Sequence, residues 1–209
     1  MARYIGPVCK LCRREGIKLF LKGERCDTSK CALVRKKSEM GAKPKGAKKK
    51  LSNYAVQLRE KQKLKRIYGI LEKQFKNYFV KAKKQRGIVG DNLLTLLERR
   101  LDNVICRLNW VVSHRQARQL VKHGFLLVNG RRVDVPSFLV KSGDEIRLKE
   151  DKNIKELVET SLKSKGQKDI PSWLLLDTQK ILAKILKIPT REDVIIPIKE
   201  QLVVELCSR

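Results

Sequence analysis

The sequence has few acidic residues, few aromatic residues and only two histidines. Asp and Glu number 22 against 49 Lys and Arg, which gives a formal net charge of +27. A surface with so large an excess of one sign repels copies of itself and attracts a polyanion. Aromatic residues make up 5% of the chain, and we expect them to serve the core rather than to stack on bases. The charge imbalance therefore favours a protein that binds nucleic acid.

The sequence also lacks an apolar run of about 18 residues, the length that a membrane-spanning helix needs. Its first residues, MARYIGPVCK, contain no apolar core followed by a cleavage site, so we expect no secretory signal. We therefore predict a cytoplasmic protein with no membrane partner. Disulfides are rare in that reducing compartment.

The positive charge is concentrated in the first part of the chain. Residues 1–90 carry 27 Lys and Arg against 6 Asp and Glu, or +21, whereas residues 91–209 carry 22 against 16, or +6. A length of 209 residues with 42% hydrophobic content allows one or two domains with a real core. The first part is thus expected to face phosphate, and the rest to resemble an ordinary folded domain.

Four of the six cysteines lie close together near the start of the chain. Cys9, Cys12, Cys26 and Cys31 follow the spacing C-x2-C, thirteen residues, C-x4-C. Two close pairs separated by a loop suit a tetrahedral ion with no open position. We therefore predict one structural Zn2+ held by these four residues. An iron–sulfur cluster has the same ligands and stays open as an alternative, while two disulfides would not suit a reducing compartment.

Residues 32–50 are rich in Lys, Gly and Ala without periodicity, which is typical of a linker or basic arm. A helical pattern with many cations begins at Ser52 and ends at the turn RGIVGDN. Asp91 is a candidate N-cap for a second helix, whose apolar stripe runs from Leu94 to Leu108.

The segment after this stripe predicts a capped helix and a hairpin. Ser113 with Gln116 three residues later forms a capping box, and Gly124 ends the helix. At 100° per residue, one face carries apolar side chains and the opposite face a basic ridge of Arg115, Arg118 and Lys122. The sequence FLLVNGRRVDV then predicts a β-hairpin with a two-residue turn at Asn129-Gly130. The last segment, DVIIPIKEQLVVELCS, has strand-like apolar runs.

Residues 100–146, from RLDNVICRLNW to SGDEI, closely resemble the small RNA-binding module named after small-subunit ribosomal protein four. Residues 57–75, QLREKQKLKRIYGILEKQF, resemble the long helix of that ribosomal protein family (uS4) itself. The opening MARYIGPVCKLCRREG resembles its metal-binding, four-cysteine branch. The resemblance covers nearly the whole chain. It departs in residues 35–50, where Lys replaces a loop that usually contains Pro, Gly and His.

The resemblance implies an α+β fold, in which an αα hairpin and small antiparallel sheet are inserted into a mostly helical domain. The expected parts are a zinc knuckle and basic arm at 1–42, a basic helical domain at 43–90 completed by 190–209, and the inserted module at 91–189 with its core at 99–150.

The implied function is that of a structural constituent of the small ribosomal subunit. It is a primary binder of the 5′ domain of small-subunit ribosomal RNA that nucleates assembly. Expected neighbours are ribosomal proteins three and five and the mRNA where it enters the subunit, with an effect on decoding accuracy. We expect no enzymatic activity and no small-molecule substrate.

Three other functions agree less well with the sequence. An RNA-modifying enzyme would need a separate catalytic domain, and a zinc deaminase would need an H-x-E signature beside the cysteines; neither is found. A stand-alone RNA chaperone or ribosome-binding factor would not need the cysteine knuckle.

We predict these RNA-binding residues: Arg3, Lys10, Arg13, Arg14, Lys22, Arg59, Lys61, Lys63, Lys65, Arg66, Arg100, Arg107, Ser113, Arg115, Arg118, Lys122, Asn129 and Arg131.

Overall fold

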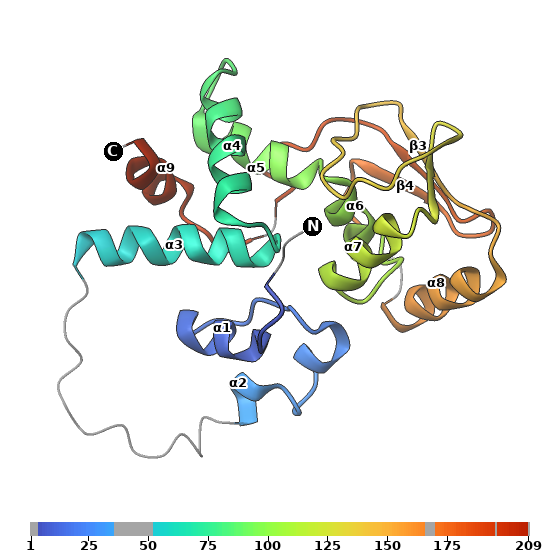
Figure 1. Ribbon diagram of the computed structural model, residues 1–209, viewed down its shortest axis with the longest axis horizontal. Helices are drawn as coiled ribbons and strands as arrows, with labels where there is room; N and C mark the ends of the chain where they lie inside the picture. Colours follow the sequence, from blue (N-terminus) through green and yellow to red (C-terminus); the bar gives the residue numbers. More distant parts are fainter. Residues whose placement is uncertain (1–3, 36–51, 166–169, 195, 209) are drawn as a thin grey trace. The chain divides into compact units, whose positions relative to one another are not determined.

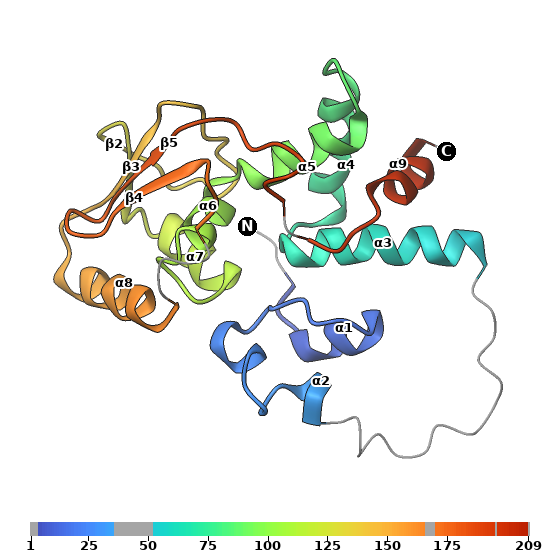
Figure 2. The same cartoon turned by 180° about the vertical axis from the view of Figure 1, so that it is seen from behind.

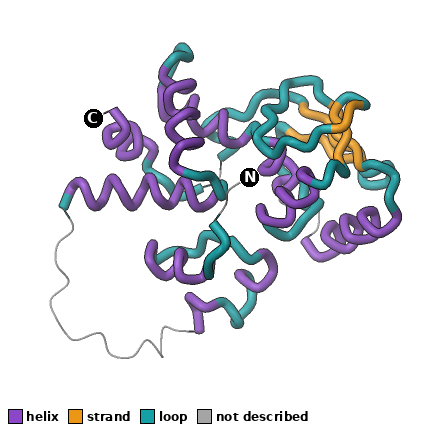
Figure 3. Tube along the Cα trace, viewed as in Figure 1, coloured by secondary structure: helices purple, strands orange, loops and turns teal. Residues whose placement is uncertain are grey.

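The computed structural model describes residues 4–35, 52–165, 170–194 and 196–208 (Figure 1). The chain divides into two compact units. Unit 1 combines Met1–Val80 with Pro197–Arg209, and unit 2 is Lys81–Ile196. The described part is α+β and mostly helical, with its strands gathered in one small antiparallel sheet (Figure 3). The predicted mixed class with a small antiparallel sheet is thus confirmed.

Unit 1 is helical in its described residues. It contains α1 (Val8–Glu15), the 3-10 helix η1 (Gly23–Cys26), α2 (Ala32–Arg35), α3 (Asn53–Ile67), the larger part of α4 (Glu72–Lys83) and α9 (Glu200–Ser208). The predicted start of α3 is confirmed, because the Ser52 hydroxyl accepts a hydrogen bond from the Ala55 amide at 3.3 Å. Such a cap satisfies one of the amides left unpaired at a helix start.

The C-terminal helix α9 packs on α3, so residues from opposite ends of the chain share one unit (Figure 1). The Gln57 amide donates to the Glu205 carboxylate at 2.8 Å, and the Lys199 amide donates to Glu60 at 3.3 Å. The packing buries Val203 completely. Our expectation of strand-like runs at this end is wrong. The helix propensity of β-branched residues is only mildly unfavourable, and tertiary packing overrides it.

Unit 2 contains α5 (Val89–Glu98), α6 (Leu101–Arg107), α7 (His114–Lys122), β1 (Leu126–Val128), β2 (Arg131–Arg132), β3 (Glu145–Leu148), α8 (Lys152–Lys165), β4 (Leu174–Asp177) and β5 (Leu182–Ile185). The sheet has the order β2-β1-β3-β5-β4 with antiparallel neighbours, so β2 forms an edge (Figure 2). The predicted αα hairpin and β-hairpin are therefore confirmed as α6–α7 and β1–β2.

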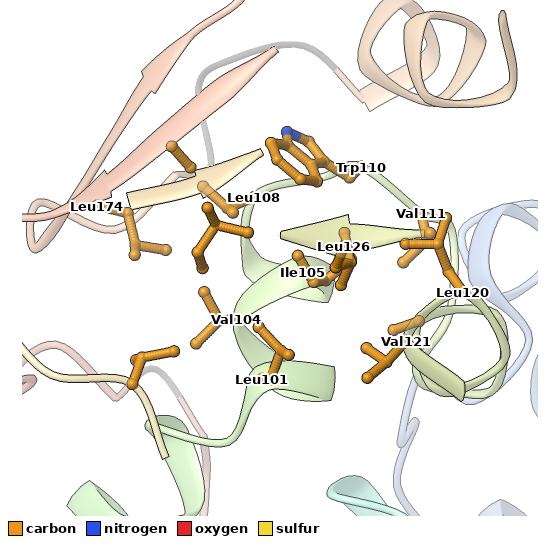
Figure 4. Close-up of a cluster of buried hydrophobic side chains, with 14 of the residues drawn as sticks. Leu101, Val104, Ile105, Leu108, Trp110, Val111, Leu120, Val121, Leu126 and Leu174 are labelled. Atoms are coloured by element: carbon orange, nitrogen blue, oxygen red, sulfur yellow. The ribbon is translucent and has the colours of Figure 1, made fainter. Parts of the chain in front are cut away.

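A continuous apolar core joins α6 and α7 to the sheet (Figure 4). Leu101, Ile105 and Trp110 are fully buried in it, and Val158 of α8 reaches the same core. Burying side chains of this size contributes roughly 1.5–3 kcal/mol each relative to exposure. The αα hairpin is thus fixed on the sheet, and the loops and helix faces that it leaves exposed keep a defined position.

The predicted second helix is in fact two helices, α5 and α6. The break occurs because another segment of unit 2 pairs with the backbone at this point. The Leu101 amide donates to the Phe138 carbonyl at 2.9 Å, and the Val140 amide donates to the Arg99 carbonyl at 3.0 Å. A continuous helix would use the Leu101 amide and the Arg99 carbonyl for its own hydrogen bonds, and here both are bonded to another segment. The periodicity of the sequence does not reveal these long-range bonds. Asp91 lies in the first turn of α5, which is capped at Ile88 instead.

Asp102 is the centre of a buried ion-pair network at the start of α6. The Arg100 guanidinium donates to both carboxylate oxygens, at 3.0 Å and 2.7 Å, and Arg118 of α7 approaches the carboxylate at 3.4 Å. The side chains of Arg100 and Asp102 are 0% and 4% exposed. Arg100 is fully buried in this network, and its contact with RNA stays a prediction.

Asp102→Ala is expected to lower the free energy of unfolding by about 3–5 kcal/mol, because the buried Arg100 would lose its counter-charge. Chemical denaturation of the purified protein measures this loss. The matched control is Asp134→Ala, which removes an exposed carboxylate 3.8 Å from Lys122 and should change stability by less than about 0.5 kcal/mol. Equal losses in the two variants would contradict the network's role.

Candidate RNA-binding surface and cysteine cluster

Helix α7 begins with the predicted capping interaction. The Ser113 hydroxyl accepts a hydrogen bond from the Gln116 amide at 3.4 Å, and the Gln116 side chain accepts one from the Val112 amide at 3.0 Å. The hydrogen bond of the Gln116 side chain is therefore made with Val112, one residue before the N-cap, rather than with Ser113 itself. Gly124 ends the helix with a φ of 73°, as expected of a left-handed C-terminal glycine. Both ends of α7 are fixed, and so are the side chains that it presents.

The two predicted faces of α7 are present, with one difference. Ala117, Leu120 and Val121 are buried in the core, as predicted. Arg115 and Lys122 are exposed. The side chain of Arg118 is only 13% exposed because it turns towards Asp102. Arg118 is thus less exposed than Arg115 and Lys122, since helical geometry gives the direction of the Cβ atom but not the partner that the guanidinium finds. Its contact with RNA stays a prediction.

The turn after β1 is of the predicted type. Asn129 and Gly130 both have positive φ, at 50° and 77°, as a type I′ turn requires. The Asn129 amide nitrogen donates to Asp144 at 2.8 Å, and its oxygen accepts from the Glu145 amide at 2.9 Å. The side chain of Asn129 thus fastens the hairpin to the start of β3, while Arg131 next to it is exposed.

Arg132 joins the hairpin to the end of α7. Its guanidinium donates to the His123 carbonyl at 3.3 Å. It also lies so close to Gly124 that a Cβ atom there would meet the Arg132 Nε at 2.1 Å. Helix end and hairpin therefore form one continuous surface, which we call the α7–β2 surface. Its exposed basic residues are Arg115, Lys122, Arg131 and Arg132.

Arg132 was not among the predicted RNA-binding residues. The dipeptide Arg131-Arg132 after the turn was the available signal. Alternation along a strand places only one of the two on a given face. Because β2 is an edge strand of two exposed residues, both side chains reach solvent.

The basic residues of α3 are largely paired with acidic residues of unit 1. Lys61 and Lys65 both contact Glu72, and Lys63 contacts Glu60. Burial raises the pKa of Glu72, but hydrogen bonds from the two lysines outweigh it, so the pKa lies below its ordinary value. These three lysines are 12–20% exposed. Their contact with RNA stays a prediction, and part of their charge is already neutralised.

Glu15 links the N-terminal segment to α3. Its side chain is fully buried, and its carboxylate pairs with Arg59 at 3.2 Å and with Arg66. Two guanidinium groups on one buried carboxylate leave a net positive charge at this junction. Arg107 of unit 2 is held in a similar way by Glu98, at 2.6 Å, and stays 27% exposed.

The four predicted metal ligands lie on three short elements. Cys9 and Cys12 are on α1, Cys26 ends η1, and Cys31 directly precedes α2. The Lys22 amide donates to the Cys26 sulfur at 3.4 Å. Gly16, with a φ of 72°, ends α1 and turns the chain back.

Burial raises the pKa of both the Cys12 and the Cys26 thiols, and Cys9 and Cys31 raise the pKa of each of them further. A backbone amide hydrogen bond acts in the opposite direction on each sulfur. The thiols are thus near enough to repel one another as thiolates, which is the electrostatic problem that a divalent cation resolves.

The predicted metal site is not confirmed. Across residues 4–35, 52–165, 170–194 and 196–208, no group of three or more His, Cys, Asp or Glu side chains has the arrangement of a metal site. The donor set itself suits zinc: four reduced cysteines, two of them buried, with at least one sulfur accepting an amide hydrogen bond.

Exposed cations surround this cysteine cluster. Lys10, Arg14 and Lys22 are exposed, and Arg13 is half-buried. Arg3 and the Lys-rich residues 36–50 lie outside the described residues.

Within the described part of the chain, no helix is both long and apolar enough to cross a membrane.

Comparison with known proteins assigns both parts of the chain. The family described as the ribosomal protein S4/S9 N-terminal domain matches residues 3–98, and the S4 domain matches residues 99–146. Small ribosomal subunit protein uS4 of Thermus thermophilus is 53% identical over 209 residues, which is the full length of both chains. The chain belongs to the uS4 family. Its relatives in Thermodesulfovibrio yellowstonii and Desulfitobacterium hafniense are 51% and 52% identical over the same full length. The family is one of structural rather than enzymatic proteins.

Proposed function

We propose that this uS4 protein is a structural constituent of the small ribosomal subunit that binds its ribosomal RNA. The observation that carries the proposal is the identity of 51–53% over the whole chain with proteins named small ribosomal subunit protein uS4. Residues 99–146, which match the S4 domain, include the whole α7–β2 surface. As part of the ribosome, the protein would act in the cytoplasm.

The physical character of the α7–β2 surface supports RNA as the ligand. Proteins recognise A-form RNA mostly through phosphates, 2′-hydroxyls and shape, because its major groove is too deep and narrow for side chains. That recognition needs cations at fixed positions. Arg115 and Lys122 stand on a helix capped at both ends, and Arg131 and Arg132 on a hairpin fastened to that helix. Little conformational freedom is then lost on binding.

The finer role rests on the family resemblance alone. We propose that the protein binds the 5′ domain of the ribosomal RNA early and nucleates subunit assembly. It would lie beside ribosomal proteins three and five, near the mRNA where it enters, and influence decoding accuracy there.

We further propose that Cys9, Cys12, Cys26 and Cys31 hold one structural zinc ion. The support is the paired spacing, the four reduced thiols and the amide hydrogen bond to Cys26. The ion would supply no reaction. It would remove the mutual repulsion of the thiolates and fix the loop between the two pairs, so that exposed cations such as Lys10 and Lys22 keep their positions.

Lys122→Glu combined with Arg131→Glu is expected to weaken binding to a 5′-domain RNA fragment by roughly 2–4 kcal/mol, because two attractions to phosphate become repulsions. Filter binding at fixed salt measures the affinity, and thermal unfolding checks that the fold is kept. The matched control is Lys155→Glu combined with Lys163→Glu, two exposed positions of α8 that lie outside residues 99–146. Equal loss in the control would show that only net charge matters.

The salt dependence of the affinity should be steep. Each phosphate contact adds roughly 0.7–0.9 to the slope of log affinity against log salt, by counterion release. Replacing the seven lysines of residues 36–50 by serine should lower the slope by several units while keeping the length of the segment. A slope unchanged from the wild type would mean that this segment takes no part in binding.

Protein purified without oxygen should contain about one zinc per chain, and Cys26→Ser should lose it, because a structural site needs all four ligands. Elemental analysis gives the count. Cys207→Ser on α9 is the control and should keep the metal. Labile sulfide in the wild type would favour an iron–sulfur cluster instead, and metal-free protein with four reactive thiols would contradict both.

A further inference from the structure

Cys106 of α6 lies against His114, the first residue of α7. The Cys106 sulfur is 3.7 Å from the His114 Nδ1 atom. Both residues are partly exposed, and Cys106 is a reduced thiol. Their contact has no part in the proposed function.

The hydrogen bonds around Asn103 decide which nitrogen of His114 carries the proton. The Asn103 amide nitrogen donates to the Glu98 carbonyl at 3.0 Å and to the Glu98 carboxylate at 2.6 Å. Both partners are acceptors, so this end of the side chain is the NH2 group. The oxygen of Asn103 therefore faces the His114 Nε2 atom, 3.1 Å away.

An acceptor opposite Nε2 requires that Nε2 carries the hydrogen. In the neutral imidazole the lone pair then lies on Nδ1, directed at Cys106. The thiol donates to that lone pair, and the imidazole is placed to take its proton. Cys106 is thus placed as a nucleophile, His114 as its base, and Asn103 as the group that orients the base.

The surrounding charges favour the protonated imidazole. Burial lowers the pKa of His114, but Cys106 and Asp102 raise it and outweigh the opposing effect of Arg107, so the pKa lies above its ordinary value. Glu98 pairs with Arg107 and so weakens the effect of Arg107 on His114. Arg100 and Arg118 both pair with the carboxylate of Asp102. An imidazolium beside a sulfur stabilises the thiolate, which is the reactive form.

We propose that Cys106 is a nucleophilic thiol activated by His114, and that it is a site of covalent modification by low-molecular-weight disulfides. Asn103 is a positioning residue, because it fixes the tautomer and orientation of His114. The proposal is independent of the ribosomal role of the protein.

The reaction is a thiol–disulfide exchange. The Cys106 proton moves to His114 Nδ1, and the thiolate attacks one sulfur of the small disulfide. A new S–S bond forms as the old one breaks, and the other half of the reagent leaves as a thiolate with the bonding electron pair. Cys106 is oxidised to a mixed disulfide, the leaving half is reduced, and the imidazolium proton passes to that thiolate or to water.

Cys207 of α9 provides an internal comparison. It is a reduced thiol that is partly exposed, as Cys106 is. Burial raises its pKa, and no histidine is among the groups that act on it. A difference in reactivity between these two thiols in the same protein therefore reports on their surroundings rather than on the reagent.

The test treats the full-length protein with the aromatic disulfide 5,5′-dithiobis(2-nitrobenzoate) and resolves each labelled cysteine by peptide mass spectrometry. At pH 6.5, Cys106 should react at least about tenfold faster than Cys207. The ratio of the two labelling rates should shrink towards pH 9.5, because ordinary thiols also ionise there. Equal rates at pH 6.5 would overturn the proposal. This comparison needs no variant, so it does not depend on the folding of one.

His114→Ala should slow the labelling of Cys106 about tenfold at pH 6.5 and less than about twofold at pH 9.5, while Cys207 is unaffected. Loss of the base should act only where the thiol is not already ionised. Slowing by the same factor at both pH values would mean that the variant changes access to the sulfur, and it would overturn the role of His114, as would an unchanged rate.

Discussion

The carboxylate of Asp102 is shared by two guanidinium groups, and the arrangement of the RNA-binding module depends on it. Arg100 precedes α6, and Arg118 lies on α7, so one buried acid holds the start of one helix against the side of the next. Removing a buried charge from its partners costs much more than a surface ion pair contributes. The network therefore holds the start of α6 in place and fixes how α7 lies on it. The position of the α7–β2 surface follows from that geometry.

The scarce acidic residues serve a similar purpose in unit 1. Glu15 pairs with Arg59 and Arg66 and joins the N-terminal segment to α3, and Glu60 and Glu72 hold lysines of the same helix. These five pairs bring cations inward and leave unbalanced positive charge on the outer surface. A chain of net charge +27 would otherwise repel itself. The number of cations in a segment is consequently a poor guide to how many of them reach RNA.

The surfaces that remain basic are rigid in different ways. The α7–β2 surface is held by a capped helix, a type I′ turn and the contact of Arg132 with the end of α7. The cysteine cluster has little apolar core of its own in the described residues, where Val8 and Leu19 are buried beside Cys26 and Cys31. A small segment of this kind usually needs a metal ion for independent stability. The zinc proposal thus answers a physical need of unit 1 as well as explaining the cysteine spacing.

The sequence by itself determined the polyanionic ligand, the start of α3, the cap and the buried face of α7, and the turn at Asn129. Each of these depends on composition or on contacts within a few residues. The family followed from motifs, and the comparisons confirmed it. Tertiary structure alone decided that Arg100 and Arg118 turn inward, that α5 and α6 are separate, that the C-terminal segment is helical, and that Cys106 meets His114. All four depend on partners brought together by folding. An ionic side chain or a backbone group goes to the partner that best replaces its lost water, and that partner is chosen in space rather than along the chain.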